Sequence, residues 1–342
     1  MGIDKRKEEI LKKVVEEYIS TGQPVGSERI VDRLSFPLSS ATARSEMLEL
    51  EKMGYLFQPY TSAGRVPTSK GYRFSIESIL KDNKQKNLKQ IRLPAPEKLN
   101  DLRVTLDEVA NLISSYTKEI SLVFSPSGED VRIRYVHLFT INPGSVYLVL
   151  ITNTQTSEAV SMGDVNLSED VLRRIENLVN EKLSNIPIKT AIEIMKRENY
   201  FEGEVKEGKE VLHFLDSYLK KELEQGEKRE IYIKGISNLL STRISIAEQK
   251  IKSLLYMLEE KKTISNIVEK ITEKERLGFS IGEENVLPEL SDYSLIAVKY
   301  TVKEMEGHLA LLGPTRMDYL KGIFVLDKIA DKLEDIVGKI IG

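Results

Sequence analysis

Apolar residues recur at helical spacing in the N-terminal part of the chain. Residues 4–20 place an apolar stripe opposite a face of Lys and Glu, which predicts an amphipathic helix. The Gly and Pro residues of 21–26 end that helix, and Ser27 is suited to cap a short second one. Ser39 can cap a third helix, which ends at Gly54. The chain is therefore predicted to begin with three helices.

Two strand-like runs follow at residues 55–58 and 66–68, and a turn containing Gly and Ser lies between them. Helix, short helix, turn, third helix and hairpin is the order of elements in a winged helix-turn-helix, whose third helix enters the major groove of DNA. We expect this module to span residues 1–81 and a polar, basic linker to span residues 82–100.

Beyond the linker the pattern alternates between β-rich and helical stretches. Residues 119–162 hold three candidate strands, and helical periodicity returns at Ser168. Further strands and a final helix follow in the C-terminal part. Two stretches of mixed α/β pattern with helices between them indicate a discontinuous domain that carries an insertion. We assign residues 101–165 and 229–342 to the discontinuous domain and residues 166–228 to the insert.

Composition excludes several classes of chemistry. The 342 residues include no Cys, so the chain has no disulfide framework, thiol nucleophile or thiolate metal site, and its three His are scattered. The sequence contains no Gly-rich phosphate loop, nucleophile motif or metal-ligand spacing, so we expect no enzyme, no cofactor and no metal. No segment reads as a signal peptide or reaches the ~18 apolar residues of a transmembrane helix. A cytoplasmic protein without a membrane partner is expected.

Charge is distributed unevenly along the chain. The formal net charge is −3, whereas residues 60–92 hold eight basic and two acidic residues. A local basic excess in an acidic protein is the electrostatic footprint of nucleic-acid binding. A solvated linker is the alternative interpretation for residues 81–89.

The third predicted helix presents small residues and one arginine on its outer side. Small residues let a helix approach the major groove closely, and Arg44 can reach a guanine edge or a phosphate, although a merely solvated Arg44 is the alternative. Arg65 lies beside Gly64 at the expected tip of the wing. Three acidic residues of the helix should point away from phosphate: Glu46, Glu49 and Glu51. The predicted DNA-binding residues are Ser40, Ala41, Thr42, Arg44, Ser45, Thr61, Ser62, Gly64, Arg65, Lys70 and Arg73.

Short motifs are spread from the first predicted helix to the last. They are residues 18–27 (YISTGQPVGS), 41–44 (ATAR), 58–68 (QPYTSAGRVPT), 71–73 (GYR), 282–285 (GEEN) and 313–319 (GPTRMDY). On these motifs the chain resembles the HrcA family of bacterial heat-inducible transcription repressors. It departs from the family pattern at Ser45, where Asn is common, and at Tyr60, where His is common, but both side chains can still form hydrogen bonds.

The resemblance implies a fold and a function. The fold class would be α+β multidomain, with an N-terminal winged helix-turn-helix, a GAF-like α/β domain in the discontinuous segments and an inserted dimerisation domain. The function would be repression of heat-shock chaperone operons by a homodimer that binds an inverted-repeat operator in double-stranded DNA and is released on heat stress. The resemblance also implies dependence on the GroEL chaperonin. The alternative is an effector-sensing transcription regulator whose GAF-like domain binds a small molecule.

Two further expectations concern packing. The region from Ser168 to Leu223 offers two amphipathic helices, which we expect to supply much of the dimer surface, although covering a neighbouring sheet is the alternative. Their apolar residues are Leu172, Ile175, Leu178, Leu212, Leu215 and Leu219. Near the C-terminus, Arg316 and Asp318 are expected to form a buried ion pair that fixes a turn.

Overall fold

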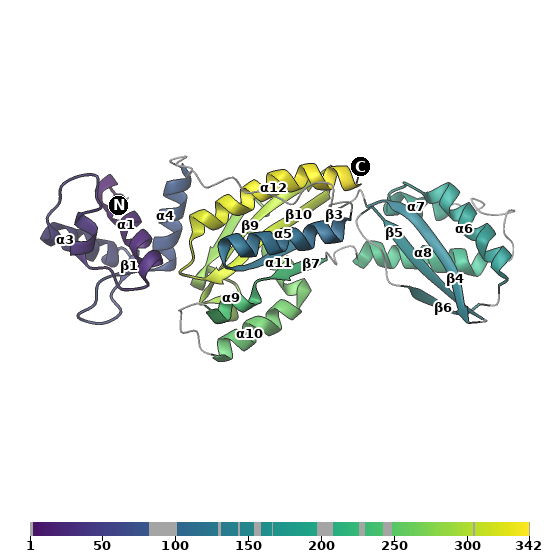
Figure 1. Cartoon of the computed structure of the whole chain (residues 1–342), viewed down its shortest axis with the longest axis horizontal. Helices are drawn as coiled ribbons and strands as arrows, with labels where there is room; N and C mark the ends of the chain where they lie inside the picture. The colour runs from purple at the N-terminus through teal and green to yellow at the C-terminus, as the bar shows by residue number, and fades with distance from the viewer. Residues whose placement is uncertain are drawn as a thin grey trace.

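The structure, a computed structural model, describes residues 3–81, 101–128, 131–142, 144–153, 159–165, 167–196, 208–225, 230–241, 248–303 and 305–341. The predicted linker, residues 82–100, lies outside these ranges. The described chain forms three bodies in a row: an N-terminal module, a central domain and an insert that branches from the central domain (Figure 1). Among the described helices, none combines the length and the apolar character that crossing a membrane requires.

The N-terminal module consists of helices around a short hairpin. Its elements are α1 (Lys5–Thr21), α2 (Ser27–Val31), α3 (Ser40–Lys52), β1 (Leu56–Phe57), β2 (Val66–Pro67) and α4 (Ser69–Lys81). Asp4 caps α1 by accepting a hydrogen bond from the Lys7 amide at 2.8 Å, and Gly22 ends the helix with a left-handed φ of 69°. Apolar side chains of α1 and α3, among them Leu11 and Leu50, lie fully buried in its core. The elements follow the predicted order.

The central domain is built on a five-stranded antiparallel sheet with the order β7-β3-β10-β9-β8. Its strands are β3 (Ile120–Gly128), β7 (Ile231–Lys234), β8 (Leu277–Ile281), β9 (Tyr293–Val302) and β10 (Met305–Pro314). One face is covered by α5 (Leu102–Thr117) and α12 (Tyr319–Ile341), the other by α9 (Ile236–Ser241), α10 (Glu248–Glu259) and α11 (Lys261–Ile271). Because both faces are covered, β9 and β10 are buried along nearly their whole length.

The insert leaves the central sheet after β3 and returns at β7, which pairs with β3. Its elements are β4 (Ile133–Asn142), β5 (Ser145–Thr152), β6 (Val160–Asp164), α6 (Glu169–Leu183), α7 (Ile188–Met195) and α8 (Lys209–Gln225). The three strands form their own sheet and the insert has its own hydrophobic core. Strands β4, β5 and β6, which fall in the segment assigned from the sequence to the discontinuous domain, therefore lie in the insert. Alternating strands have the same pattern whichever sheet they join, so periodicity cannot place this boundary.

Helices α6 and α8 pack against one face of the insert's sheet. Four of the apolar residues expected at a dimer surface are buried in this core: Leu172, Ile175, Leu215 and Leu219. Of the other two, Leu178 is buried and Leu212 is partly buried against the same core. These helices therefore match the alternative expectation from the sequence, in which their apolar residues cover a neighbouring sheet of the same chain.

Helix α6 also lies along the outer edge of β4. The Asn180 side-chain amide pairs with the Val136 backbone, accepting from its N–H and donating to its carbonyl, both at 2.8 Å. One turn earlier in the helix, the Glu176 carboxylate accepts from the Leu138 amide of β4 at 2.8 Å. One turn after Asn180, the Ser184 hydroxyl donates to the Arg134 carbonyl of β4 at 3.2 Å. Four residues of a helix rise about 6 Å and two residues of a strand rise about 7 Å. Side chains one turn apart on α6 can therefore reach backbone groups two residues apart on β4.

Candidate nucleic-acid interface

Helix α3 presents one face to solvent along its length. Ser39 caps the helix, because its hydroxyl accepts from the Thr42 amide at 3.1 Å. Buried on the inner face are Ala43, Met47 and Leu50. Exposed are four of the residues predicted to bind DNA: Ala41, Thr42, Arg44 and Ser45. A fifth, Ser40, is half-buried, and its hydroxyl lies 3.0 Å from that of Ser27, which fixes α2 against α3.

Cations from a neighbouring helix pair with acidic residues of α3. Lys7 of α1 lies 3.0 Å from both Glu46 and Glu49, and its hydrogen bonds to these carboxylates raise its pKa. Arg44, in contrast, has no ion-pair partner among the residues that the structure describes. The outer face of α3 thus keeps a free guanidinium, while Lys7 offsets part of the negative charge of two nearby carboxylates.

The loop between β1 and β2 is braced by a side chain. Gln58 Nε2 donates to the carbonyls of Thr61 and Ala63 at 3.0 and 2.9 Å. The Ala63 amide donates to the Tyr60 carbonyl at 2.8 Å, which closes a turn. Thr61 and Ser62 are exposed at this turn, and Tyr60 beside them is 62% exposed. These three residues form the tip of the hairpin.

Arg65 lies where the loop joins β2 and not at the exposed turn, which was the position expected from the sequence. Its amide and carbonyl pair with the Val25 backbone at 2.8 and 2.9 Å. A Cβ on Gly64 would lie 2.3 Å from the Val25 carbonyl, so only Gly permits this approach. Arg65 Nη2 lies 2.9 Å from Glu51 of α3, and only 14% of the arginine side chain is exposed. Arg65 therefore holds the hairpin against α3.

Two other predicted cations are engaged within the protein. Lys70 Nζ donates to the Met53 carbonyl at 2.8 Å. Arg73 Nε and Nη2 donate to the two carboxylate oxygens of Glu284 at 2.7 and 2.6 Å, and this pairing raises the pKa of Arg73. The same Nη2 donates to the Phe279 carbonyl at 2.8 Å, and the guanidinium lies 4.5 Å over the Phe279 ring. Arg73 thereby joins the N-terminal module to the central domain.

Further contacts complete this junction. The rings of Tyr72 and Tyr319 lie 5.4 Å apart, and burial raises the pKa of both hydroxyls. The Arg316 guanidinium packs against Gly22, where a Cβ would lie 2.0 Å from Nη1. Asp318 accepts from an amide in the first turn of α12 at 3.1 Å. The buried ion pair expected between Arg316 and Asp318 is therefore not formed in the part of the chain that the structure describes.

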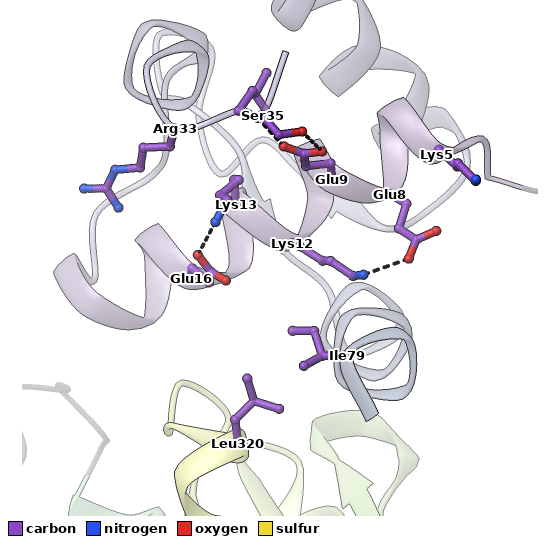
Figure 2. Close-up of a pocket in the computed structure, with 11 residues that line it drawn as sticks. Lys5, Glu8, Glu9, Lys12, Lys13, Glu16, Arg33, Ser35, Ile79 and Leu320 are labelled. Atoms are coloured by element: carbon purple, nitrogen blue, oxygen red, sulfur yellow. Dashed lines mark hydrogen bonds and ion pairs between the residues drawn. The ribbon is translucent and has the colours of Figure 1, made fainter. Parts of the chain in front are cut away.

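A cleft of about 670 Å³ lies between α1 and the junction (Figure 2). Ile79 of α4 and Leu320 of α12 face each other across it. Charged residues of α1 along its wall pair with one another, as Lys12 does with Glu8 at 2.8 Å. The positive and negative charges that line the cleft compensate one another, so its electrostatic potential would not favour a ligand of either charge. The described residues also contain no cluster of three His, Asp or Glu side chains placed to hold a metal ion.

One exposed residue of α3 was not singled out from the sequence. Leu48 is 42% exposed and lies one turn after Arg44 on the same face of the helix. Residues four positions apart share a face of a helix, so the outward position predicted for Arg44 also predicts that Leu48 is exposed.

The chain is similar to known proteins along its full length. A model of the HrcA protein C-terminal domain matches residues 103–323. The heat-inducible transcription repressor HrcA of Acetivibrio thermocellus is 31% identical over 357 aligned positions, which cover 100% of this chain and 98% of that protein. The repressor of the same description from Alkaliphilus metalliredigens is 30% identical, with 98% of each chain covered. A crystal structure at 2.2 Å described as a hypothetical protein has a TM-score of 0.68 at 24% identity, covering 99% of this chain and 100% of its own.

Proposed function

Because the chain belongs to the HrcA family of heat-inducible transcription repressors, we propose that it represses chaperone operons by binding an inverted-repeat operator in double-stranded DNA. In this proposal the N-terminal module is a winged helix-turn-helix, with α3 as the recognition helix and the β1–β2 hairpin as the wing. The observation that carries the proposal is the outer face of α3. There Arg44 is exposed without an ion-pair partner among the described residues, while Lys7 holds Glu46 and Glu49.

The predicted DNA-binding residues divide into those that contact DNA and those that shape the surface. Base edges are read by residues on the exposed face of α3, namely Ala41, Thr42, Arg44 and Ser45. The backbone is contacted by Thr61 and Ser62 at the tip of the wing. The surface is shaped by contacts of Ser40, Gly64, Arg65 and Lys70. Arg73 fixes the module on the central domain.

The second part of the proposal is a two-fold dimer, because an inverted repeat is matched by two-fold symmetry in the protein. The insert has a sheet face suited to self-association. On β4 and β5, the ring of Phe139 stacks with those of His137 and Tyr147 at 5.4 and 5.7 Å, and Tyr135 is 40% exposed. Aromatic residues are enriched in the cores of protein interfaces. The insert is then the dimerisation domain and the central domain is the GAF-like domain that carries it.

Operator binding is tested by a gel-shift assay with the full chain and promoter DNA from a chaperone operon. We expect a complex that an unlabelled inverted repeat displaces and a scrambled repeat of equal length does not. Adding GroEL should increase the fraction of chain that binds, as the family resemblance implies. Equal displacement by both competitors would contradict specific binding, and an unchanged fraction would contradict the chaperonin dependence.

The dimer surface is tested by sedimentation of the full chain. Phe139→Lys places a charge in the aromatic row and should give a monomer. Tyr256→Lys is the matched control, because Tyr256 is a 70% exposed aromatic residue on α10 of the central domain. A dimeric Phe139→Lys chain would place the interface elsewhere, and a monomeric wild-type chain would contradict the dimer.

A further inference from the structure

One stripe of α3 is exposed and contains no carboxylate. Successive residues of an α-helix are rotated by about 100°, so five outer residues of α3 lie within a sector of about 100°. These residues are Ala41, Arg44, Ser45, Leu48 and Lys52, and all five are exposed. The buried residues Ala43, Met47 and Leu50 lie on the opposite side. The stripe is thus an exposed part of α3 that presents no negative charge to a ligand.

Leu48 is the large apolar residue of this stripe. It is 42% exposed, whereas Met47 and Leu50 on the inner face are 3% and 0% exposed. A single exposed leucine is common on protein surfaces. The position of Leu48 is distinctive, because Arg44 precedes it by one turn and Lys52 follows it by one turn. If Arg44 reads a base edge and Lys52 approaches a phosphate, the leucine between them faces the base edges of the major groove.

We propose that Leu48 contacts the 5-methyl group of a thymine in each operator half-site and so contributes to sequence specificity. This inference rests on the function proposed above. Thymine is distinguished in the major groove by its methyl group, which apolar side chains contact. The leucine side chain has no donor or acceptor for the nitrogen and oxygen atoms of the other base edges. Contact with the methyl group removes apolar surface of both partners from water.

The helix geometry limits where this thymine lies. Arg44 and Leu48 are separated by about 6 Å along the axis of α3, at 1.5 Å per residue. Base pairs are about 3.4 Å apart along DNA. The thymine should therefore lie within about two base pairs of the position that Arg44 reads.

The test begins with selection of a binding sequence from a random DNA library by the full wild-type chain. Each thymine of the selected half-site is then replaced by uracil, which removes the methyl group and keeps every hydrogen-bonding atom. At one position near the Arg44-dependent base pair, uracil should weaken wild-type binding about fourfold, as expected for about 0.8 kcal/mol per buried methyl-sized group. Leu48→Ala should bind the thymine and uracil sites equally. Ala favours helix, so α3 is retained, as circular dichroism checks.

Two matched variants sharpen the result. Leu48→Met keeps an apolar side chain and should keep the discrimination between thymine and uracil. Lys52→Ala changes a charge on the same stripe and should also keep it. The proposal is overturned if no uracil substitution affects the wild-type chain, or if Leu48→Ala discriminates as strongly as wild type. A wild-type chain that selects no sequence at all overturns the DNA-binding function itself, which separates the two failures.

Discussion

Arg44 on α3 and Arg73 on α4 lie in two regions of the N-terminal module, and the surroundings of the two side chains differ. Arg44 on α3 is exposed and has no ion-pair partner among the described residues. Arg73 on α4 uses its guanidinium on Glu284, on a carbonyl and on the ring of Phe279. Both residues belong to the same predicted DNA-binding set. The comparison teaches that a basic residue in a sequence marks a charge, whereas only the packing around it decides whether that charge is available to a partner.

Removal of the exposed Arg44 side chain should have the largest effect on operator binding. Arg44→Ala is expected to weaken operator binding by about 1–3 kcal/mol and to leave binding to random DNA nearly unchanged, because one base contact is lost. Fluorescence anisotropy at fixed salt measures both. Arg173→Ala, at an exposed position of α6, is the control for the change of charge. Equal losses on both DNAs would make Arg44 a phosphate contact, and no loss would remove it from the interface.

The central domain contains a carboxyl group, that of Glu119, whose ionisation opposes folding. Glu119 lies against Gly313, and burial raises its pKa to about 8 although Lys321 lowers it. The folded chain keeps this proton while the unfolded chain, with a pKa near 4.5, releases it, so stability falls as the pH rises from 4.5 to 8. Glu119→Gln should remove this fall, and the shift sets about 4–5 kcal/mol as the upper limit of the gain in stability at pH 8. Urea unfolding across this pH range measures it, and identical pH slopes for both chains would contradict the assignment.

The two carboxylates around Arg73 provide an internal comparison. Glu284→Gln should lower stability by about 1 kcal/mol, because it weakens two charge-assisted hydrogen bonds. Glu77→Gln is the control, since Glu77 lies 3.3 Å from Arg73 but is 45% exposed and should matter less. Hydrogen exchange of α4 amides should follow the same order. Equal effects of the two variants would mean that the pairing across the junction is no stronger than an ordinary surface pair.

Arg65 should give the smallest effect on the salt dependence of binding. Its ion pair with Glu51 assigns it to holding the hairpin, so Arg65→Ala should weaken binding to all DNA sequences severalfold while leaving the salt slope unchanged. The Lys52→Ala variant serves for comparison, because that lysine is exposed on the outer face of α3. A salt slope reduced by about one unit in Arg65→Ala would show a direct phosphate contact instead.

The elements of the N-terminal module were predictable because each boundary has a local signal. The Ser39 hydroxyl caps α3 and the left-handed Gly22 ends α1, and both features are visible in the sequence. The exposed position of Arg44 followed from the period of the helix. These features depend on residues within a few positions of one another.

The features that the sequence did not reveal depend on distant residues. Arg73 and Glu284 are 211 positions apart, so neither local spacing nor charge pairs them. The extent of the insert was underestimated, because β4, β5 and β6 alternate as strands of the central sheet could. The place of Arg65 at the end of the loop, and not at its tip, depends on the bridge to Val25, 40 positions away in the sequence. Tertiary contacts decide all three.

The row of hydrogen bonds from α6 to the edge of β4 has a consequence for aggregation. An unpaired strand edge is a template on which other extended chains can add. Here Asn180 and Glu176 occupy the backbone groups that such a chain would use. Along this edge, an extended segment of another chain would meet a helix in place of unpaired strand groups. The same contacts oppose the addition of a strand from a second copy of this chain at β4.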